Sequence, residues 1–246
     1  MDAKLELATK LYDKGDYYKA LPLLEELITV FRGTKKAEKT YYLYAYTNYK
    51  LGDYQSAAYD FENFAKTYPN SEFAEECAYM HAYCFYQDSP EYSLDQTNTY
   101  KAINELQLFA DRYPKSERVK VCNTLIDELR SKLELKTYQS AEMYFHMELY
   151  RASIVTYKLL LDDFPSTNFR EEVLFKIVKA SYNLAENSIE EKKVARYEET
   201  IKAYTDFTSA YPDSRQKEKA EDYSVSARKR LDKINFNSVQ LDSKNR

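Results

Sequence analysis

The chain has 246 residues, with 36 basic and 40 acidic side chains and a formal net charge of −4. This near balance gives no bulk positive field for nucleic acid, and no run of 18 apolar residues predicts a membrane span. The low content of helix-breaking residues, 3 Gly and 6 Pro, favours an all-helical protein.

A twenty-residue pattern, clearest in Gly52–Ser71, recurs along the chain. Its Gly-Asp start predicts a tight turn. Small and aromatic residues then follow Tyr54 at +3, +7, +10 and +14, which is the stripe of a helix packed along one face. Pro69 ends the helix, because the residue before a proline is disfavoured in the α region. The other copies start at Tyr17, Thr99, Tyr150 and Tyr197.

Each copy is predicted to be the second helix of a helical hairpin. The five hairpins are expected, in chain order, at residues 3–31, 36–68, 72–113, 116–164 and 168–211. The fourth begins with a long helix, because residues 116–147 contain neither Pro nor Gly. Residues 214–234 are expected to form a charged helix, which suits the polar cap that ends a helical array. Residues 235–246 are expected to be a disordered tail.

Small residues recur at the positions where paired helices cross. Ala8 and Ala20 lie twelve residues apart in the first hairpin, as do Ala45 and Ala57 in the second. This spacing is typical of the tetratricopeptide repeat (TPR). The sequence therefore predicts an all-α TPR superhelix of five hairpins plus a C-terminal capping helix, forming a single solenoid over residues 1–234.

Six tyrosines are predicted to share one surface on the first helices of the second and third hairpins. The predicted peptide-binding residues are Tyr42, Tyr46, Tyr49, Tyr79, Tyr83 and Tyr86, with Lys39 and Lys50 at the borders. Tyrosine offers a wide contact area at low rotamer cost and a hydroxyl for backbone groups. We therefore expect a groove for an extended peptide rich in aromatic or apolar residues. The alternative is that some of these rings only fill space between neighbouring repeats.

The remaining candidates predict no chemistry. Cys77, Cys84 and Cys122 lack metal-ligand spacing and are expected to be small buried hydrophobes. The chain has no glycine-rich phosphate loop and no G-x-S-x-G motif. Carboxylate pairs such as Glu75-Glu76 are explained as solvated faces or partners of the helix dipole. No metal, cofactor or catalytic residue is expected, and the chain is predicted not to be an enzyme.

Several features together resemble one family. They are the Y-P-x-S stops, the number of repeats, the loop inside the third repeat and the long helix opening the fourth. The segments that carry the likeness are Gly15–Ala20, Tyr54–Ser71, Ala78–Ser89, Phe109–Ser116 and Lys136–Phe164. They resemble the BamD family, the TPR lipoproteins of the outer-membrane β-barrel assembly (BAM) machinery.

The resemblance implies a periplasmic scaffold held at the outer membrane by a lipidated N-terminal cysteine outside this sequence. It implies that the C-terminal repeats bind the POTRA domains of BamA. It also implies that the N-terminal repeats bind the aromatic-ending C-terminal segments of unfolded outer-membrane proteins. Accessory BamC and BamE partners do not follow from it. The alternative is a YbgF-like TPR adaptor of the cell envelope with division or peptidoglycan partners.

Overall fold

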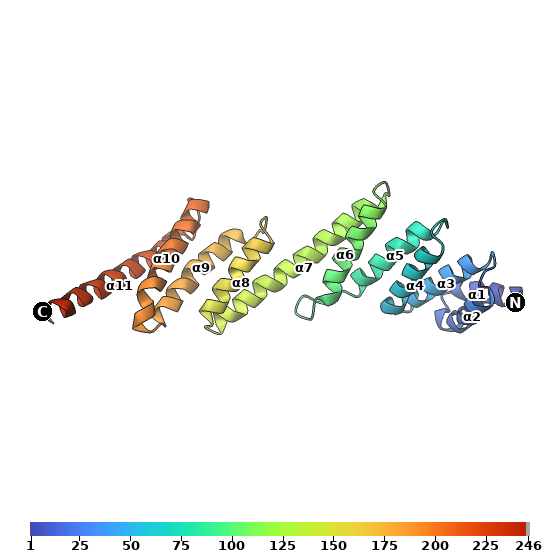
Figure 1. Ribbon diagram of the computed structural model, residues 1–246, viewed down its shortest axis with the longest axis horizontal. Coiled ribbons are helices and arrows are strands. Elements are labelled where there is room, and N and C mark those ends of the chain that lie inside the picture. Colours follow the sequence, from blue (N-terminus) through green and yellow to red (C-terminus); the bar gives the residue numbers. More distant parts are fainter. Residues whose placement is uncertain (245–246) are drawn as a thin grey trace. The chain divides into compact units, whose positions relative to one another are not determined.

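The computed structural model describes the backbone of residues 1–244 and the side chains of residues 1–236, and all regular elements in that part are helices (Figure 1). In chain order they are α1 (Asp2–Asp13), α2 (Tyr17–Val30), α3 (Ala37–Lys50), α4 (Tyr54–Thr67), α5 (Ala74–Gln87), α6 (Thr97–Arg112), α7 (Arg118–His146), α8 (Tyr150–Asp163), α9 (Arg170–Glu186), α10 (Glu190–Ala210) and α11 (Lys217–Lys244).

The helices form five successive hairpins, from α1–α2 to α9–α10, followed by α11. Helices adjacent in sequence pack together from α1 to α6 and from α8 to α11. In addition, α1 contacts α3 and α11 contacts α9, so first helices of neighbouring hairpins also meet. This arrangement confirms the predicted fold class, an all-α TPR fold of five hairpins and a terminal helix.

The contacts divide the chain into two compact units, Met1–Leu133 and Glu134–Arg246. Unit 1 holds α1 to α6 and the first part of α7, and unit 2 holds the rest of α7 and α8 to α11. The boundary falls inside α7, the long helix predicted from its lack of Pro and Gly. That all hairpins form a single solenoid stays a prediction.

Small residues do lie at the helix crossings. Ala8, Ala20, Ala45 and Ala57 are fully buried. In the fourth hairpin a serine takes the equivalent place, and the Ser153 hydroxyl donates to the Ala141 carbonyl at 3.0 Å. A larger side chain at such a position would push the two backbones apart.

The turns inside the first, second and fourth hairpins share one backbone form but not one sequence. Gly15 and Gly52 adopt φ of 78° and 81°, the left-handed region that glycine enters freely. Asp53 then caps α4, since its Oδ1 accepts from the Ser56 N–H at 3.1 Å. Between α7 and α8 the same left-handed position is held by Glu148, with φ of 60°. The residue after it, at the cap position of α8, is Leu149, which has no side-chain acceptor.

The last helix is longer than predicted. α11 continues to Lys244, past residue 234, where the predicted capping helix ends and the predicted tail begins. Leu231 and Ile234 pack against a buried cluster that includes Tyr197 and Ala227, and no Gly or Pro follows to stop the helix. The remainder of the predicted tail, residues 245–246, lies outside the described residues.

Candidate functional site

The six predicted tyrosines form one continuous series of ring contacts in unit 1, which we call the tyrosine surface. On α3, the ring centroids of Tyr42 and Tyr46 lie 4.7 Å apart and those of Tyr46 and Tyr49 lie 6.3 Å apart. Tyr49 reaches across to Tyr83 of α5 at 6.3 Å. Further along α5, Tyr79–Tyr83 and Tyr83–Tyr86 are stacked pairs with centroids 5.6 Å apart. The structure thus brings all six residues together.

One side of the tyrosine surface rests on the core. The Tyr42 ring lies 4.5 Å from Phe73, and the Tyr46 ring lies 4.9 Å from Phe61. Tyr79 is buried, with 8% of its surface exposed, whereas the other five tyrosines are only partly buried. The space-filling interpretation therefore fits Tyr79 well, and the other five rings retain surface that a ligand can contact.

Two hydroxyls of the tyrosine surface donate to carboxylates on the next first helix. The Tyr46 hydroxyl donates to Glu76 Oε1 at 2.6 Å, and the Tyr86 hydroxyl donates to Glu128 Oε2 at 2.6 Å. Burial and the Glu76 carboxylate raise the pKa of Tyr46 well above its usual range. The hydrogen bond to Glu128, together with burial, raises the pKa of Tyr86 to about 12. Both phenols therefore stay protonated and keep their donor role.

Burial also raises the pKa of three other phenols of the tyrosine surface. It raises the pKa of Tyr79 to about 12, and it raises the pKa of Tyr42 and of Tyr49. Tyr12 on α1 lies outside this series, with its ring centroid 5.4 Å from that of Tyr17, and burial raises its pKa to about 12. Glu76 and Glu128 thus lie beside phenols whose raised pKa values keep them as hydrogen-bond donors.

Cations also lie at the tyrosine surface. The guanidinium carbon of Arg118, the first residue of α7, lies 4.5 Å from the Tyr79 ring centroid, and its Nη2 lies 3.4 Å from Glu76 Oε1. Lys50 Nζ lies 5.8 Å from the Tyr49 ring centroid. Lys39, the other predicted border residue, is exposed and lines a hollow of about 300 Å³ between α1 and α3. The two lysines therefore lie toward opposite ends of α3.

Sequence reasoning missed Glu76, Arg118 and Glu128. A signal for Glu76 was present, because residues 76, 79, 83 and 86 share one helical stripe. Its position in the first turn of α5 suggested a helix-dipole partner instead. Arg118 and Glu128 meet the tyrosines only through the way α7 packs on α5, and no periodicity within one helix reveals that packing.

The histidines and cysteines have structural surroundings. Cys77, Cys84 and Cys122 are free and fully buried, and burial raises the pKa of Cys77 and of Cys84 to about 12. Such thiols are unreactive because the thiolate is disfavoured. His81 joins three helices, with Nδ1 2.8 Å from the Ala58 carbonyl and Nε2 3.3 Å from Glu105. Within the described residues, no group of His, Cys, Asp and Glu is suited to hold a metal ion.

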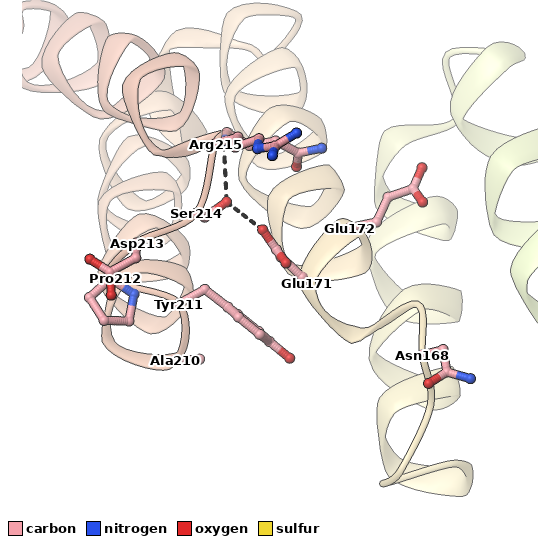
Figure 2. A pocket seen from close by; sticks show the side chains of 10 residues that line it. Asn168, Glu171, Glu172, Ala210, Tyr211, Pro212, Asp213, Ser214 and Arg215 are labelled. Atoms are coloured by element: carbon pink, nitrogen blue, oxygen red, sulfur yellow. Dashed lines mark hydrogen bonds between the residues drawn. The ribbon is translucent and has the colours of Figure 1, made fainter.

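A polar hollow of about 650 Å³ lies in unit 2, between the end of α10 and the start of α9 (Figure 2). The Ser214 hydroxyl donates to Glu171 Oε1 at 2.6 Å and accepts from the Gln216 N–H at 3.1 Å. The same serine-to-glutamate bond joins Ser116 to Glu75 at 2.6 Å in unit 1. Because it recurs, this hydrogen bond is a feature of the repeat.

An apolar hollow of about 650 Å³ lies at the α7–α8 turn in unit 2. Its lining includes Leu149 and Val155, which are 48% and 61% exposed, and it reaches Leu184 of α9. Exposed apolar side chains gathered at one place are typical of protein-interaction sites.

A protein-family model and a solved structure are similar to this chain. The family model YfiO, described as an outer membrane lipoprotein, matches residues 4–197. A complex of the TPR2AB domain of yeast Sti1 with pHSP90 is similar in structure, with 11% identity, 99% of this chain and 95% of that chain covered, and a TM-score of 0.43. No curated protein matches the chain.

None of the helices in the part that the structure describes is long and apolar enough to cross a membrane. The YfiO match extends from the first hairpin into α10 and thus covers most of the sequence. The chain therefore belongs to the YfiO family of outer membrane lipoproteins, which is the BamD family that its sequence resembles.

Proposed function

We propose that this protein is a non-enzymatic periplasmic scaffold of outer-membrane protein assembly, lipid-anchored at the outer membrane. In this proposal the N-terminal hairpins bind unfolded β-barrel proteins, and the C-terminal hairpins bind the POTRA domains of BamA. The observation that carries client binding is the tyrosine surface, with its unbroken series of six rings across α3 and α5. Membership of an outer membrane lipoprotein family supports the cellular setting.

The spacing of the rings supports an extended client segment. Side chains on one face of a β-strand repeat about every 7 Å along the chain. Neighbouring rings from Tyr46 to Tyr86 have centroids 5.6–6.3 Å apart, which is close to that repeat. Alternate aromatic or apolar side chains of a barrel strand would thus meet successive rings. Aromatic pairs of this kind stabilise a contact by about 0.5–1.5 kcal/mol beyond area burial.

The turn between α7 and α8 supports a partner on unit 2. A left-handed Glu148 and an uncapped Leu149 are each unfavourable for the fold by about 1 kcal/mol, compared with the Gly-Asp turns of the first two hairpins. Leu149 stands where those turns have an aspartate, and it exposes an apolar side chain beside the apolar hollow. A binding role explains why an apolar residue occupies this cap position, and in this proposal the partner is a POTRA domain.

Client binding is tested with a fluorescent peptide from a barrel strand that ends in Phe. Fluorescence anisotropy would compare the wild type with the double variant Tyr46→Ala/Tyr83→Ala. We expect the dissociation constant to rise at least about ten-fold, because two central ring contacts are lost. Equal affinities would refute the role of the tyrosine surface.

Two further variants serve as controls for this test. Tyr18→Ala removes an 83% exposed ring on α2, outside the tyrosine surface, and should leave the affinity unchanged. Because Tyr46 packs on Phe61, a Tyr46→Leu/Tyr83→Leu variant fills the same space without hydroxyls or rings. Circular dichroism would verify that each variant is folded. A pull-down with POTRA domains tests the second partner, and failure there would favour the YbgF-like adaptor.

A further inference from the structure

We propose that Tyr86 and Glu128 form a subsite for a cationic side chain, an arginine or lysine of the polypeptide bound on the tyrosine surface. This inference rests on the proposed client binding only in taking the cation to belong to that polypeptide. The subsite would add a preference for positive charge to a surface that otherwise offers aromatic rings. The subsite would select segments in which a basic residue neighbours aromatic or apolar ones.

The first observation is the geometry of the rings on α5. Tyr79, Tyr83 and Tyr86 are stacked in order, with both centroid separations 5.6 Å and both interplanar angles 18°. Tyr86 is the last ring of this stack, and its hydroxyl donates to Glu128 Oε2 at 2.6 Å. Tyr86 is partly exposed and Glu128 is exposed. An electron-rich ring face beside a carboxylate attracts an ammonium or guanidinium group.

The second observation is that the chain fills a similar arrangement with its own arginine. At the other end of the same stack, Arg118 lies 4.5 Å from the Tyr79 ring centroid and 3.4 Å from Glu76. Glu76 also accepts a phenol hydroxyl, that of Tyr46, at 2.6 Å, just as Glu128 accepts that of Tyr86. Each end of the stack thus has a ring and a nearby carboxylate that accepts a tyrosine hydroxyl, that of Tyr86 itself at one end and that of Tyr46 at the other. Arg118 shows that a guanidinium group fits beside such a ring and carboxylate.

The third observation is the direction of α5. Tyr86 is the penultimate residue of this helix, where the helix dipole is negative and favours a cation. A cation is already drawn to this end, since Lys132 Nζ donates to Ser89 Oγ at 2.8 Å and to its carbonyl at 3.3 Å. Within the described residues, no lysine or arginine forms an ion pair with Glu128. Its carboxylate therefore remains available to a ligand.

The subsite is tested with N-acetyl-arginine amide and N-acetyl-citrulline amide, which have nearly the same shape but differ in charge. Each would be titrated into the full ¹⁵N-labelled chain, with amide shifts followed at the end of α5 and along α7. We expect the arginine amide to bind about five-fold more tightly than the citrulline amide. Glu128→Gln should remove this ratio, and Tyr86→Leu should reduce it.

Asp127→Asn is the matched control, because it removes one negative charge from the neighbouring exposed residue of α7. It should leave the five-fold ratio unchanged. Equal binding of the two amides to the wild type would overturn the proposal, as would a ratio that persists in Glu128→Gln or falls equally in Asp127→Asn. If the wild type did not bind the Phe-terminated peptide but still preferred the arginine amide, client binding would be refuted and the subsite supported. The two failures are therefore distinguishable.

Discussion

The carboxyl of Asp60 makes the stability of unit 1 depend on pH. Asp60 lies on α4 with 8% of its surface exposed, and its Oδ2 accepts from Asn48 Nδ2 of α3 at 2.8 Å. Burial raises the pKa of Asp60 from 3.8 to about 6, although the Asn48 hydrogen bond opposes the rise. The folded state thus binds the proton more tightly than the unfolded chain does.

The sign of the effect follows from this order of pKa values. Below the unfolded pKa of 3.8 the carboxyl is protonated in both states and carries no penalty. As the pH rises toward about 6, the unfolded chain ionises freely while the folded chain resists, so the free energy of unfolding falls. A difference of about two pH units corresponds to at most ~3 kcal/mol, lost by pH 7. Relaxation around the buried carboxylate reduces this figure, so we expect about 1–3 kcal/mol.

The substitution Asp60→Asn tests this reasoning, because a carboxamide has the same shape, accepts from Asn48 and carries no charge. Urea unfolding followed by circular dichroism at pH 4.5, 5.5, 6.5 and 7.5 would give the free-energy difference between variant and wild type. We expect the variant to be more stable at pH 7.5 by about 1–3 kcal/mol, with the difference shrinking toward pH 4.5. Other carboxylates titrate in both proteins and cancel in this difference.

Asp111→Asn is the control, because Asp111 is exposed and accepts only a weak 3.3 Å bond from Gln107. It should show no comparable pH-dependent gain. A stability difference for Asp60→Asn that is constant across this pH range would refute the reasoning, as would a variant less stable than the wild type at pH 7.5.

Two further variants probe the hairpins. Glu148→Gly with Leu149→Asp gives this turn the Gly-Asp sequence of the first two hairpins. The double variant should stabilise unit 2 by about 1–2 kcal/mol, seen as a higher thermal midpoint, and should weaken POTRA binding in a pull-down. A lower midpoint would contradict the strain assigned to this turn. Ala57→Leu should overpack the fully buried crossing with Ala45 by about 1–3 kcal/mol. An unchanged midpoint in differential scanning calorimetry would show that the helices do not meet closely there.

Local rules in the sequence are sufficient to predict the hairpins. Pro69 follows the last residues of α4, and small residues at Ala45 and Ala57 set the crossing of α3 and α4, so helix ends and helix pairing are both encoded within some thirty residues. The register of one helix also determines which residues share a face. That is why the sequence places the six tyrosines on one surface, where their rings do meet, while their function stays a proposal.

The turn at Glu148 shows where local rules fail. Its residues lack glycine, yet the N–H groups of Glu148 and Leu149 donate to Phe145 and Tyr144 as Gly15 and Asp16 donate to Tyr12 and Leu11. Packing of the flanking helices enforces this geometry. The Phe145 and Tyr150 rings, for example, meet across the turn at 5.5 Å. The structure imposes a left-handed residue that the sequence alone would not suggest.

The chain has 26 tyrosines, and those that hold the fold together must be distinguished from those that are available to a ligand. A phenol packs its ring in a thin core and ties neighbouring hairpins through its hydroxyl. Tyr46–Glu76 and Tyr86–Glu128 make such ties in unit 1, and Tyr138–Glu172 makes one in unit 2 at 2.9 Å.

A hydrogen bond between a tyrosine and the next hairpin is therefore not by itself evidence of binding. The Tyr138 ring stacks on Phe169 at 4.5 Å, which accounts for it as packing. The surface on α3 and α5 differs because its rings touch one another in an unbroken series and five of them keep exposed area. Folding alone does not require that continuity, and this makes it the argument for a ligand.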